Sequence, residues 1–506
     1  MERSFFEHLL GVAAKAGERV AVRDDRGELR YAELWARARG LACALALRGL
    51  AGERVGLLVS PGTEWVEAFA GCLAAGVTAV ALTELYAERE LALLVGASRA
   101  KALLVSDSLR ELASKVAGSV PVLQLSELSR ETPRVAFDRA PEGKEQSPAL
   151  LLFTSGTTGK PKGVPISHAS MLHLGQTLAR AWAFGPGDVL LHVLPLHHLH
   201  GIGVSLVVAL VSGATVRFLP RFDAERAWDE LAGATALMGV PTQHKKFFDA
   251  LDAATPERRA GWTRAARGLR LVTSGSAALP VVLGERWRSV AGQYPLERYG
   301  MTEIGIVLSN PESGERRPGT VGLPLPGVEL RLVGDDGEPV ADGAPGELWV
   351  RAPTVFAGYD GDDVATRASF RDGWFVTGDT ARRSADGYVT ILGRTSVDIL
   401  KSGGEKLSAL EIEDALREHP GVAEVAVVGL PDETWGDAVV AVIVPRAGQA
   451  EAVAEPLMRA WAKERLTAYK VPKRVVVVAE LPKNPLGKVM KGELVRRLVQ
   501  GGASSR

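Results

Sequence analysis

Short apolar runs alternate with helical patterns along the first part of the chain, and this alternation constrains the fold more than any other feature. The strand-like run 54–60, RVGLLVS, precedes a helical pattern over 64–75, and the same alternation extends from residue 19 to about residue 219. A second stretch of this kind covers 222–299. Strands that alternate with helices form parallel sheets with helices on their faces. The sequence therefore predicts a large α/β region built from packed sheets.

The pattern changes twice after residue 318. Short strands separated by Gly, Pro and Asp follow first, which predicts a small β-barrel or sheet subdomain. Residues 406–506 then contain helical patterns at 409–418 and 455–465 with strand-like runs beside them. About 100 residues are enough for a small α+β domain. We therefore expect an α/β protein whose large N-terminal region is followed by a small α+β domain.

Charge and hydropathy exclude several classes of protein. Lys plus Arg and Asp plus Glu both number 60, so we expect no nucleic-acid partner and no anionic membrane surface. The most apolar of the longer windows, residues 203–210, is too short to span a bilayer. Glu2, Glu7 and Glu18 disfavour a transit peptide, and a cytoplasmic enzyme is expected.

A run of glycines, hydroxyls and lysines follows the apolar strand 150–153. Its three glycines allow the backbone N–H groups to surround an anion, while the hydroxyls and lysines add donors and positive charge. Gly156 and Gly159 are separated by two residues, so this is not a Walker loop. The pattern predicts a polyphosphate site formed by Thr154, Ser155, Gly156, Thr157, Thr158, Gly159 and Lys160.

This loop, TSGTTGKPKG, resembles the signature of the adenylate-forming superfamily, which includes acyl-CoA synthetases, amino-acid adenylation domains and luciferases. Further stretches resemble the other signatures of that superfamily in the same order. They are YGMTE (299–303), GWFVTGD (373–379), the hinge region GR (393–394) with KSGG (401–404) and EIE (411–413), and PLGK (485–488). The resemblance implies a ligase that uses ATP, Mg2+ and coenzyme A to activate an acid as its adenylate and transfer it to a thiol.

The resemblance also implies a domain organisation. Residues 1–394 would form the nucleotide- and acid-binding domain, 395–401 the hinge, and 402–506 a mobile lid that carries the catalytic Lys488. The pivot is one of Ser396, Val397 and Asp398, and the sequence leaves these alternatives open.

Roles for individual residues follow from the resemblance. Thr154, Ser155, Thr157, Thr158 and Lys160 would hold the β- and γ-phosphates. Thr302 would donate to the α-phosphate, Glu303 would bind Mg2+, and Lys488 would bridge the substrate carboxylate and the α-phosphate. Tyr299 would stack on adenine, Asp379 would accept hydrogen bonds from the ribose hydroxyls, and Arg394 would reach the ribose or a phosphate. Ser276 and Ala277 would line the nucleotide pocket. Gly403 and Gly404 would let a pantetheine arm pass; no carrier domain is fused after the last strand-like run, which favours free coenzyme A.

Simpler interpretations exist for three of these residues taken alone. Asp379 could cap a turn, and Glu303 could be an acid at the start of a helix. Lys488 could be a solvated surface lysine. Their joint occurrence in the order of the superfamily favours the catalytic interpretation.

Four of the nine histidines, His192, His197, His198 and His200, lie close together. No Cys pair or HExxH pattern accompanies them, so we expect no zinc site. The resemblance places this segment at the acyl pocket, with His200 and Ser274 as substrate-binding residues. No Asp occurs between 195 and 210, which disfavours an α-amino acid substrate.

Arg298 precedes the YGMTE signature, at a position where relatives that use uncharged acids mostly have Gly. A guanidinium there would bind a second carboxylate on the substrate, although an ion pair with Glu297 or a packing role is an alternative. ERYGMTE, SNP (309–311) and GVPT (239–242) together resemble malonyl-CoA synthetases. Malonate is therefore the predicted acid. The alternatives are methylmalonate, acetate or a small aliphatic acid, or a non-catalytic or light-emitting relative.

Overall fold

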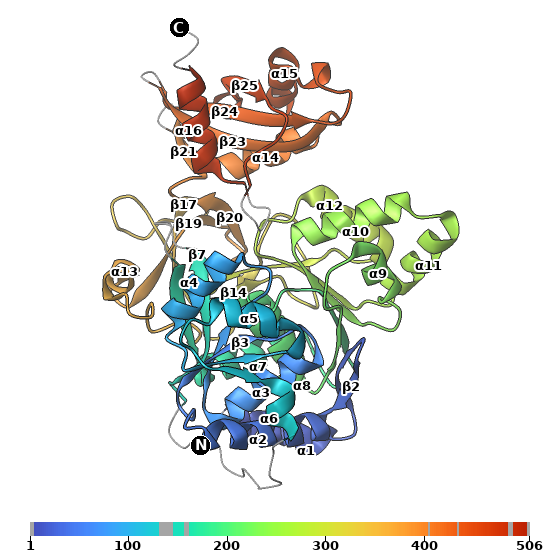
Figure 1. The fold of residues 1–506 in the computed structure, drawn as a ribbon. Helices are drawn as coiled ribbons and strands as arrows, with labels where there is room; N and C mark the ends of the chain where they lie inside the picture. Colours follow the sequence, from blue (N-terminus) through green and yellow to red (C-terminus); the bar gives the residue numbers. More distant parts are fainter. Residues whose placement is uncertain are drawn as a thin grey trace. The chain divides into compact units, whose positions relative to one another are not determined.

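The computed structural model describes residues 5–130, 145–155, 161–402, 405–432, 435–483 and 489–502 (Figure 1). The chain divides into two compact units. The first consists of Met1–Glu329 and Val350–Phe375, and the second of Leu330–Trp349 and Val376–Arg506. The predicted hinge at 395–401 lies within the second unit, and its role stays a prediction.

The first unit contains a nine-stranded sheet, most of which is parallel. Its strands from β13 to β1 all run in one direction, while β14 and β2 are antiparallel to their neighbours. In spatial order they are β15 (Leu323–Pro324), β14 (Gly305–Ser309), β13 (Leu296–Met301), β12 (Leu271–Ser274), β11 (Ala236–Gly239), β9 (Val189–His192), β10 (Thr215–Phe218), β1 (Val20–Asp24) and β2 (Gly27–Arg30).

The direction of chain progression reverses beside β9. The π-helical segment η2 (His200–Leu206) and α8 (Val207–Ser212) connect β9 to β10 on one side, and the chain then returns to β11 on the other. Leu237 of β11 packs with Trp228 and Trp287, whereas Met238 accepts a hydrogen bond from Ser205 of η2. Alternate residues of one strand therefore contact elements on opposite faces. Such a reversal leaves a crevice at the carboxyl ends of the strands.

Four helices on either side of β11 in the chain cover one face of this sheet. They are α9 (Ala224–Asp229), which precedes β11, and α10 (Pro241–Ala253), α11 (Pro256–Ala266) and α12 (Val281–Ala291), which follow it. Tryptophans and phenylalanines fill the space between them and the strands, including Trp262 and Phe247. This aromatic layer fixes where the carboxyl ends of β11 and β12 lie.

A six-stranded sheet carries the phosphate-loop sequence. Its order is β6 (Val122–Gln124), β5 (Ala102–Val105), β3 (Arg54–Leu58), β4 (Thr78–Ala81), β7 (Pro148–Ser155) and β8 (Pro161–Ser167). The strands from β6 to β7 are parallel, and β7 forms an antiparallel hairpin with β8. The predicted strand at 54–60 and helix at 64–75 match β3 and α3 (Thr63–Ala75).

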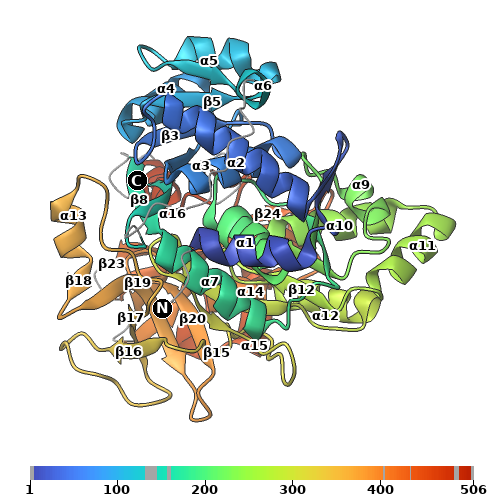
Figure 2. The same ribbon diagram turned by 90° about the horizontal axis from the view of Figure 1, so that it is seen from below.

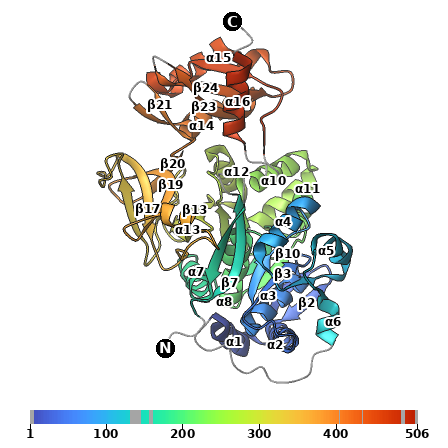
Figure 3. The ribbon, with the colours of Figure 1, turned by 60° about the vertical axis from the view of Figure 1, so that its left-hand side comes forward.

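Helices surround both sheets of the first unit. Helix α1 (Phe5–Ala16) packs against α2 (Tyr31–Leu47), α7 (His168–Ala181) and α8 (Figure 2), and α2 lies along α3 (Figure 3). The remaining helices of the six-stranded sheet are α4 (Glu88–Ser98), α5 (Arg110–Val116) and α6 (Leu125–Arg130), with a short 3-10 turn η1 (Asp107–Leu109). Among the described helices, none combines the length and apolar character that a bilayer crossing requires.

A five-stranded sheet accounts for the predicted β-rich subdomain. It contains β16 (Glu329–Val333), β17 (Pro345–Arg351), β19 (Trp374–Arg383), β18 (Phe370–Arg371) and β20 (Val389–Arg394). Strands β18 and β20 both pair antiparallel with β19. Helix α13 (Asp363–Ala368) precedes β18.

The C-terminal part of the second unit is the predicted α+β domain. Its sheet is β22 (Glu405–Ser408), β21 (Ile399–Ser402), β24 (Gly436–Pro445), β23 (Val422–Asp432) and β25 (Arg474–Val477). Val425 and Val427 pack with α14 (Ala409–Arg417) and α15 (Glu455–Arg465), whereas Val428 packs with α16 (Lys491–Gly502) on the other face. The alternation of apolar residues on both faces explains why the run at 422–428 is almost continuously hydrophobic.

Candidate functional site

The β7–β8 hairpin fixes where the predicted phosphate loop begins and ends. Thr154 pairs with Lys162 across the hairpin, and its hydroxyl donates to the carbonyl of Lys162 at 3.5 Å. Strand β7 ends at Ser155. The other predicted members of the loop, Gly156, Thr157, Thr158, Gly159 and Lys160, lie outside the described residues, so their phosphate contacts stay a prediction.

The carboxylate predicted to bind Mg2+ lies in the turn between β13 and β14. Tyr299 is in β13, and Thr302 and Glu303 form the turn, so the alternative that Glu303 starts a helix is wrong. Glu303 is buried, and its Oε1 accepts a hydrogen bond from the Tyr359 hydroxyl at 3.1 Å. A buried carboxylate suits a hard cation that is also bound by phosphate oxygens. The residues present therefore fit Mg2+.

The same tyrosine contacts the phosphate-loop hairpin. The ammonium of Lys162 lies over the Tyr359 ring, 4.7 Å from its centroid. Neither residue was among the predicted site residues. Lys162 follows the glycine-rich loop directly, but no local pattern in the sequence connects Tyr359 with Glu303, which is 56 residues away.

Arg298 is a charged residue buried in the first unit. It is 4% exposed, and its Nε and Nη2 atoms have no hydrogen-bond partner among the described residues. Burial lowers the pKa of Arg298 from 12.5 to about 9. An unpaired cation in the interior is unfavourable, so this arrangement indicates a site for an anion.

Glu297 does not supply that anion. Its two carboxylate oxygens accept from the backbone N–H groups of Leu279 and Gly319, at 3.4 and 3.2 Å. Glu297 and Arg298 are consecutive in β13, so their side chains point to opposite faces of the sheet. The alternative of an ion pair between them is therefore wrong.

The loop after β12 lies against Arg298. A Cβ atom on Gly275 would overlap the Arg298 guanidinium, so only glycine leaves room for it. Ser276, the next residue, has a positive φ of 68° and approaches His200, with 3.3 Å between its hydroxyl and Nδ1 of that histidine. Ser276 and Ala277 are exposed, and Ser274 is buried. The structure thus brings the predicted substrate residues Arg298 and His200 to the same loop.

Burial keeps His200 neutral. Its pKa is lowered well below 6.5, first by burial and then by the positive charge of Arg298. Its Nε2 and the hydroxyl of Ser274 have no hydrogen-bond partner in the described part of the chain. Arg298 therefore presents N–H donors beside His200, whereas Ser274 pairs in register with Glu297 and so lies on the opposite face of the sheet from Arg298.

The neighbouring histidines have partners that do not suggest zinc. His192 approaches the carbonyl of Gly201 at 2.9 Å, and His197 packs edge-on against Tyr86. Burial lowers the pKa of His192 to about 4 and that of His197 to about 3. Within the described ranges, no group of three or more His, Cys, Asp or Glu residues could hold a metal ion. The exclusion of zinc itself stays a prediction.

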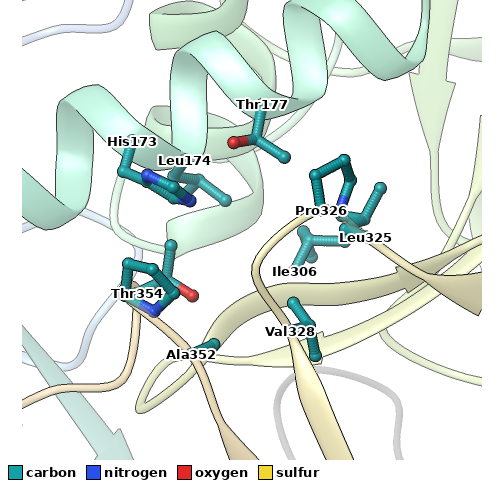
Figure 4. A pocket seen from close by; sticks show the side chains of 10 residues that line it. His173, Leu174, Thr177, Ile306, Leu325, Pro326, Val328, Ala352 and Thr354 are labelled. Carbon is teal, nitrogen blue, oxygen red and sulfur yellow. The ribbon is translucent and has the colours of Figure 1, made fainter.

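A small cavity lies between α7, β14 and the segments 325–328 and 352–354 (Figure 4). Its lining includes Leu174 and Thr177 of α7, Ile306 of β14, and Thr354. The Thr354 hydroxyl donates to the carbonyl of Ile304 at 2.6 Å. This contact anchors the turn that carries Glu303.

The second unit places Asp379 and Arg394 opposite each other on paired strands. Asp379 lies in β19, so the alternative that it caps a turn is wrong. Arg394 Nε is 3.1 Å from Asp379 Oδ1, and Nη1 donates to the carbonyl of Thr377 at 2.8 Å. The pair holds the carboxylate in a fixed orientation. Its contact with ribose stays a prediction.

One residue of the predicted hinge, Asp398, belongs to a buried ionic group. Asp398 accepts a hydrogen bond from the N–H of Arg394 at 3.0 Å and another from the ammonium of Lys491 at 2.6 Å. Lys491 also lies 2.6 Å from Glu413 of α14. Sequence reasoning missed Lys491, although it is three residues from Lys488. Lys488, Gly403 and Gly404 lie outside the described residues.

Comparisons with known proteins identify the family. The AMP-binding enzyme family matches residues 10–360, and the C-terminal domain of AMP-binding enzymes matches residues 411–488. The chain belongs to the AMP-binding enzyme family. The resemblance to adenylate-forming enzymes is thereby confirmed, and the third predicted signature, 373–379, lies between the two matched regions.

Individual members of the AMP-binding enzyme family resemble the chain over nearly its whole length. A mouse protein named malonate–CoA ligase ACSF3, mitochondrial, is 39% identical and aligns with 97% of the chain and 90% of that protein. A malonate–CoA ligase of Arabidopsis thaliana is 39% identical over 89% of the chain and 78% of that protein. The crystal structure of ATP-bound MatB from Rhodopseudomonas palustris superposes with a TM-score of 0.87 at 33% identity, covering 98% of the chain and 99% of MatB. The predicted fold class is confirmed by this similarity.

Proposed function

We propose that the protein activates malonate with ATP and transfers the malonyl group to coenzyme A, releasing AMP and pyrophosphate. The observation that carries this proposal is Arg298, a buried guanidinium with two nitrogens that have no partner among the described residues. The relatives named as malonate–CoA ligases support the same reaction.

The chemistry of Arg298 favours a diacid. Malonate has one carboxylate that reacts and a second that can remain ionised at the far end of the acyl group. A guanidinium binds a carboxylate through two parallel hydrogen bonds, which are stronger when both partners are charged. Acetate and small aliphatic acids end in a methyl group and would leave the buried cation uncompensated. Methylmalonate keeps the distal carboxylate and remains an alternative substrate.

Two steps follow from this assignment. In the first, an oxygen of the reacting carboxylate attacks the α-phosphorus of ATP and expels pyrophosphate. In the second, the coenzyme A sulfur attacks the acyl carbon, the bond to AMP breaks, and the thiol proton is released. Neither step needs a covalent enzyme nucleophile, so positioning and charge stabilisation are the contributions required of the protein.

Different residues of the chain position the substrates and stabilise their charges. Thr154, Ser155, Thr157, Thr158 and Lys160 hold the polyphosphate, Thr302 donates to the α-phosphate, and Tyr299 stacks on adenine. Glu303 would hold Mg2+, which neutralises phosphate charge when bound. Asp379 and Arg394 orient the ribose. Lys488 bridges carboxylate and phosphate after the lid, 402–506, closes about the hinge at 395–401, and Gly403 and Gly404 leave room for the pantetheine arm.

Pyrophosphate release tests the proposal directly. The purified chain is assayed with ATP, Mg2+ and coenzyme A against malonate, methylmalonate, succinate, sulfoacetate, acetate and propionate. We expect the highest kcat/KM with malonate, and malonyl-CoA as the product by mass spectrometry. A preference for acetate or propionate would refute the malonate assignment but not the ligase. No release with any acid would refute both.

The compartment stays a prediction. The sequence favours a cytoplasmic enzyme, while one of the relatives carries a mitochondrial name. Imaging of the tagged chain in its own cells decides between them.

A further inference from the structure

One loop, residues 354–360, connects the Glu303 turn with the phosphate-loop hairpin. Thr354 donates to the carbonyl of Ile304 at 2.6 Å, and the N–H of Phe356 donates to the carbonyl of Glu303 at 2.8 Å. The Tyr359 hydroxyl donates to the Glu303 carboxylate at 3.1 Å. These contacts hold the backbone and the side chain of the predicted cation-binding residue.

The other end of the loop holds strand β8. The N–H of Asp360 donates to the carbonyl of Gly163 at 2.8 Å. The Asp360 carboxylate accepts two hydrogen bonds from Arg54, both at 2.7 Å, and one from Arg99 at 2.7 Å. The hydrogen bonds from Arg54 lower the pKa of Asp360. This carboxylate therefore stays ionised at neutral pH and keeps its hydrogen bonds with Arg54 and Arg99. The loop is therefore a fixed element.

Tyr359 has little freedom within this loop. Its N–H donates to the hydroxyl of Thr366 at 2.9 Å, and its ring packs edge-on against Phe356 with centroids 4.9 Å apart. Its hydroxyl engages the Glu303 carboxylate while its face engages the Lys162 ammonium. One rigid side chain thus contacts two opposite charges that belong to the two halves of the proposed polyphosphate site.

We propose that Tyr359 is a positioning residue that orients the Glu303 carboxylate and the Lys162 ammonium to receive the Mg2+-bound polyphosphate of ATP. The proposal rests on the function proposed above. The last torsion of a glutamate is broad, so a hydrogen bond from a fixed phenol selects one orientation of the carboxylate. The face of the Tyr359 ring attracts the Lys162 ammonium and keeps it beside the 354–360 loop.

A change from Tyr359 to Phe separates this role from simple packing. Phenylalanine keeps the ring and its contact with Lys162 but removes the hydroxyl. Outer-sphere partners of metal-binding side chains typically contribute about 10- to 100-fold to metal affinity or activity. We therefore expect Tyr359→Phe to lose affinity for Mg2+·ATP specifically, whereas Tyr359→Leu should also lose affinity for ATP without metal.

Isothermal titration calorimetry without any acid substrate measures this, because no adenylate forms. Wild type and each variant are titrated with ATP in Mg2+ and with ATP in EDTA. For Tyr359→Phe we expect the dissociation constant for Mg2+·ATP to rise by about 10-fold or more, and the constant for ATP in EDTA to change by less than about twofold. Tyr469→Phe, an exposed tyrosine in the second unit, is the matched control and should match wild type in both titrations.

The outcomes separate the positioning role from the proposed function. Suppose that wild type binds Mg2+·ATP more tightly than ATP alone, and that Tyr359→Phe binds Mg2+·ATP as tightly as wild type does. This result would overturn the positioning role of Tyr359 alone. Equal losses with and without Mg2+, or a lowered melting temperature that accounts for the loss, would show a purely structural role and also overturn it. If wild type and Glu303→Gln show no preference for Mg2+·ATP over ATP, the Glu303 assignment fails and the positioning role fails with it.

Discussion

The Arg298 guanidinium occupies the space next to Gly275 that a Cβ atom would need. Gly275→Ala should therefore displace the guanidinium from its position. We expect the malonate KM to rise about 10-fold or more, because charge-assisted hydrogen bonds contribute about 1.5–3 kcal/mol, and unfolding free energy to fall by about 1–3 kcal/mol through overpacking. Steady-state kinetics and urea unfolding measure both. Gly261→Ala is the control, because its added methyl would have no neighbour within 4 Å in the described part of the chain, and it should leave both unchanged or slightly raise stability.

Replacement of Arg298 should separate substrate binding from stability. Arg298→Gly is expected to raise the malonate KM by about 10–150-fold with little change in the ATP KM. Arg298→Lys should restore part of the loss, because it supplies charge without the planar fork. Unchanged malonate kinetics in the Gly variant would contradict the assignment of Arg298.

The same position predicts an unusual effect on stability. Arg298→Met removes a buried charge that has no ion-pair partner among the described residues, while keeping similar bulk. The unfolding free energy should therefore stay equal or rise, by up to about 4 kcal/mol. Urea unfolding without ligands tests this. A large loss of stability would indicate that the arginine packs or pairs favourably in the free protein.

Lys488→Ala should block the first step and spare the second. We expect adenylate formation to fall at least about 100-fold, as for other groups that stabilise developing charge. Transfer from synthetic malonyl-AMP to coenzyme A should change only a few-fold. Lys483→Ala, which removes an exposed pairing with Glu424, is the control. Equal losses in both half-reactions of Lys488→Ala would contradict the assignment of Lys488 to the first step.

Ser396→Pro tests the hinge. The N–H groups of Thr395, Val397 and Asp398 form backbone hydrogen bonds to Gly378 and Arg394, so proline at 396 avoids these donors. By fixing φ it should favour one orientation of the lid. One half-reaction is then expected to survive at least about tenfold better than the other, relative to Ser396→Ala. Equal loss of both, with an unchanged melting curve, would argue against a pivot at this residue.

Local patterns sufficed for the elements and for the family. The helix predicted at 455–465 is α15, and the strand run at 54–60 contains β3, because apolar periodicity reflects which face of each element is buried. The signature motifs identified the adenylate-forming family because their chemistry needs fixed residue types at short spacing. The sequence also indicated Arg298, because a charged residue stands at a position where relatives that use uncharged acids mostly have glycine.

The tertiary structure decided what these residues contact. Only the packing of β12 against β13 shows that Gly275 makes room for Arg298 and that Glu297 points away from it. Likewise, only the path of the 354–360 loop brings Tyr359 to Glu303, and only the start of α16 brings Lys491 to Asp398. Sequence periodicity records burial within one element, whereas hydrogen bonds between residues 56 or 93 positions apart depend on how separate elements pack.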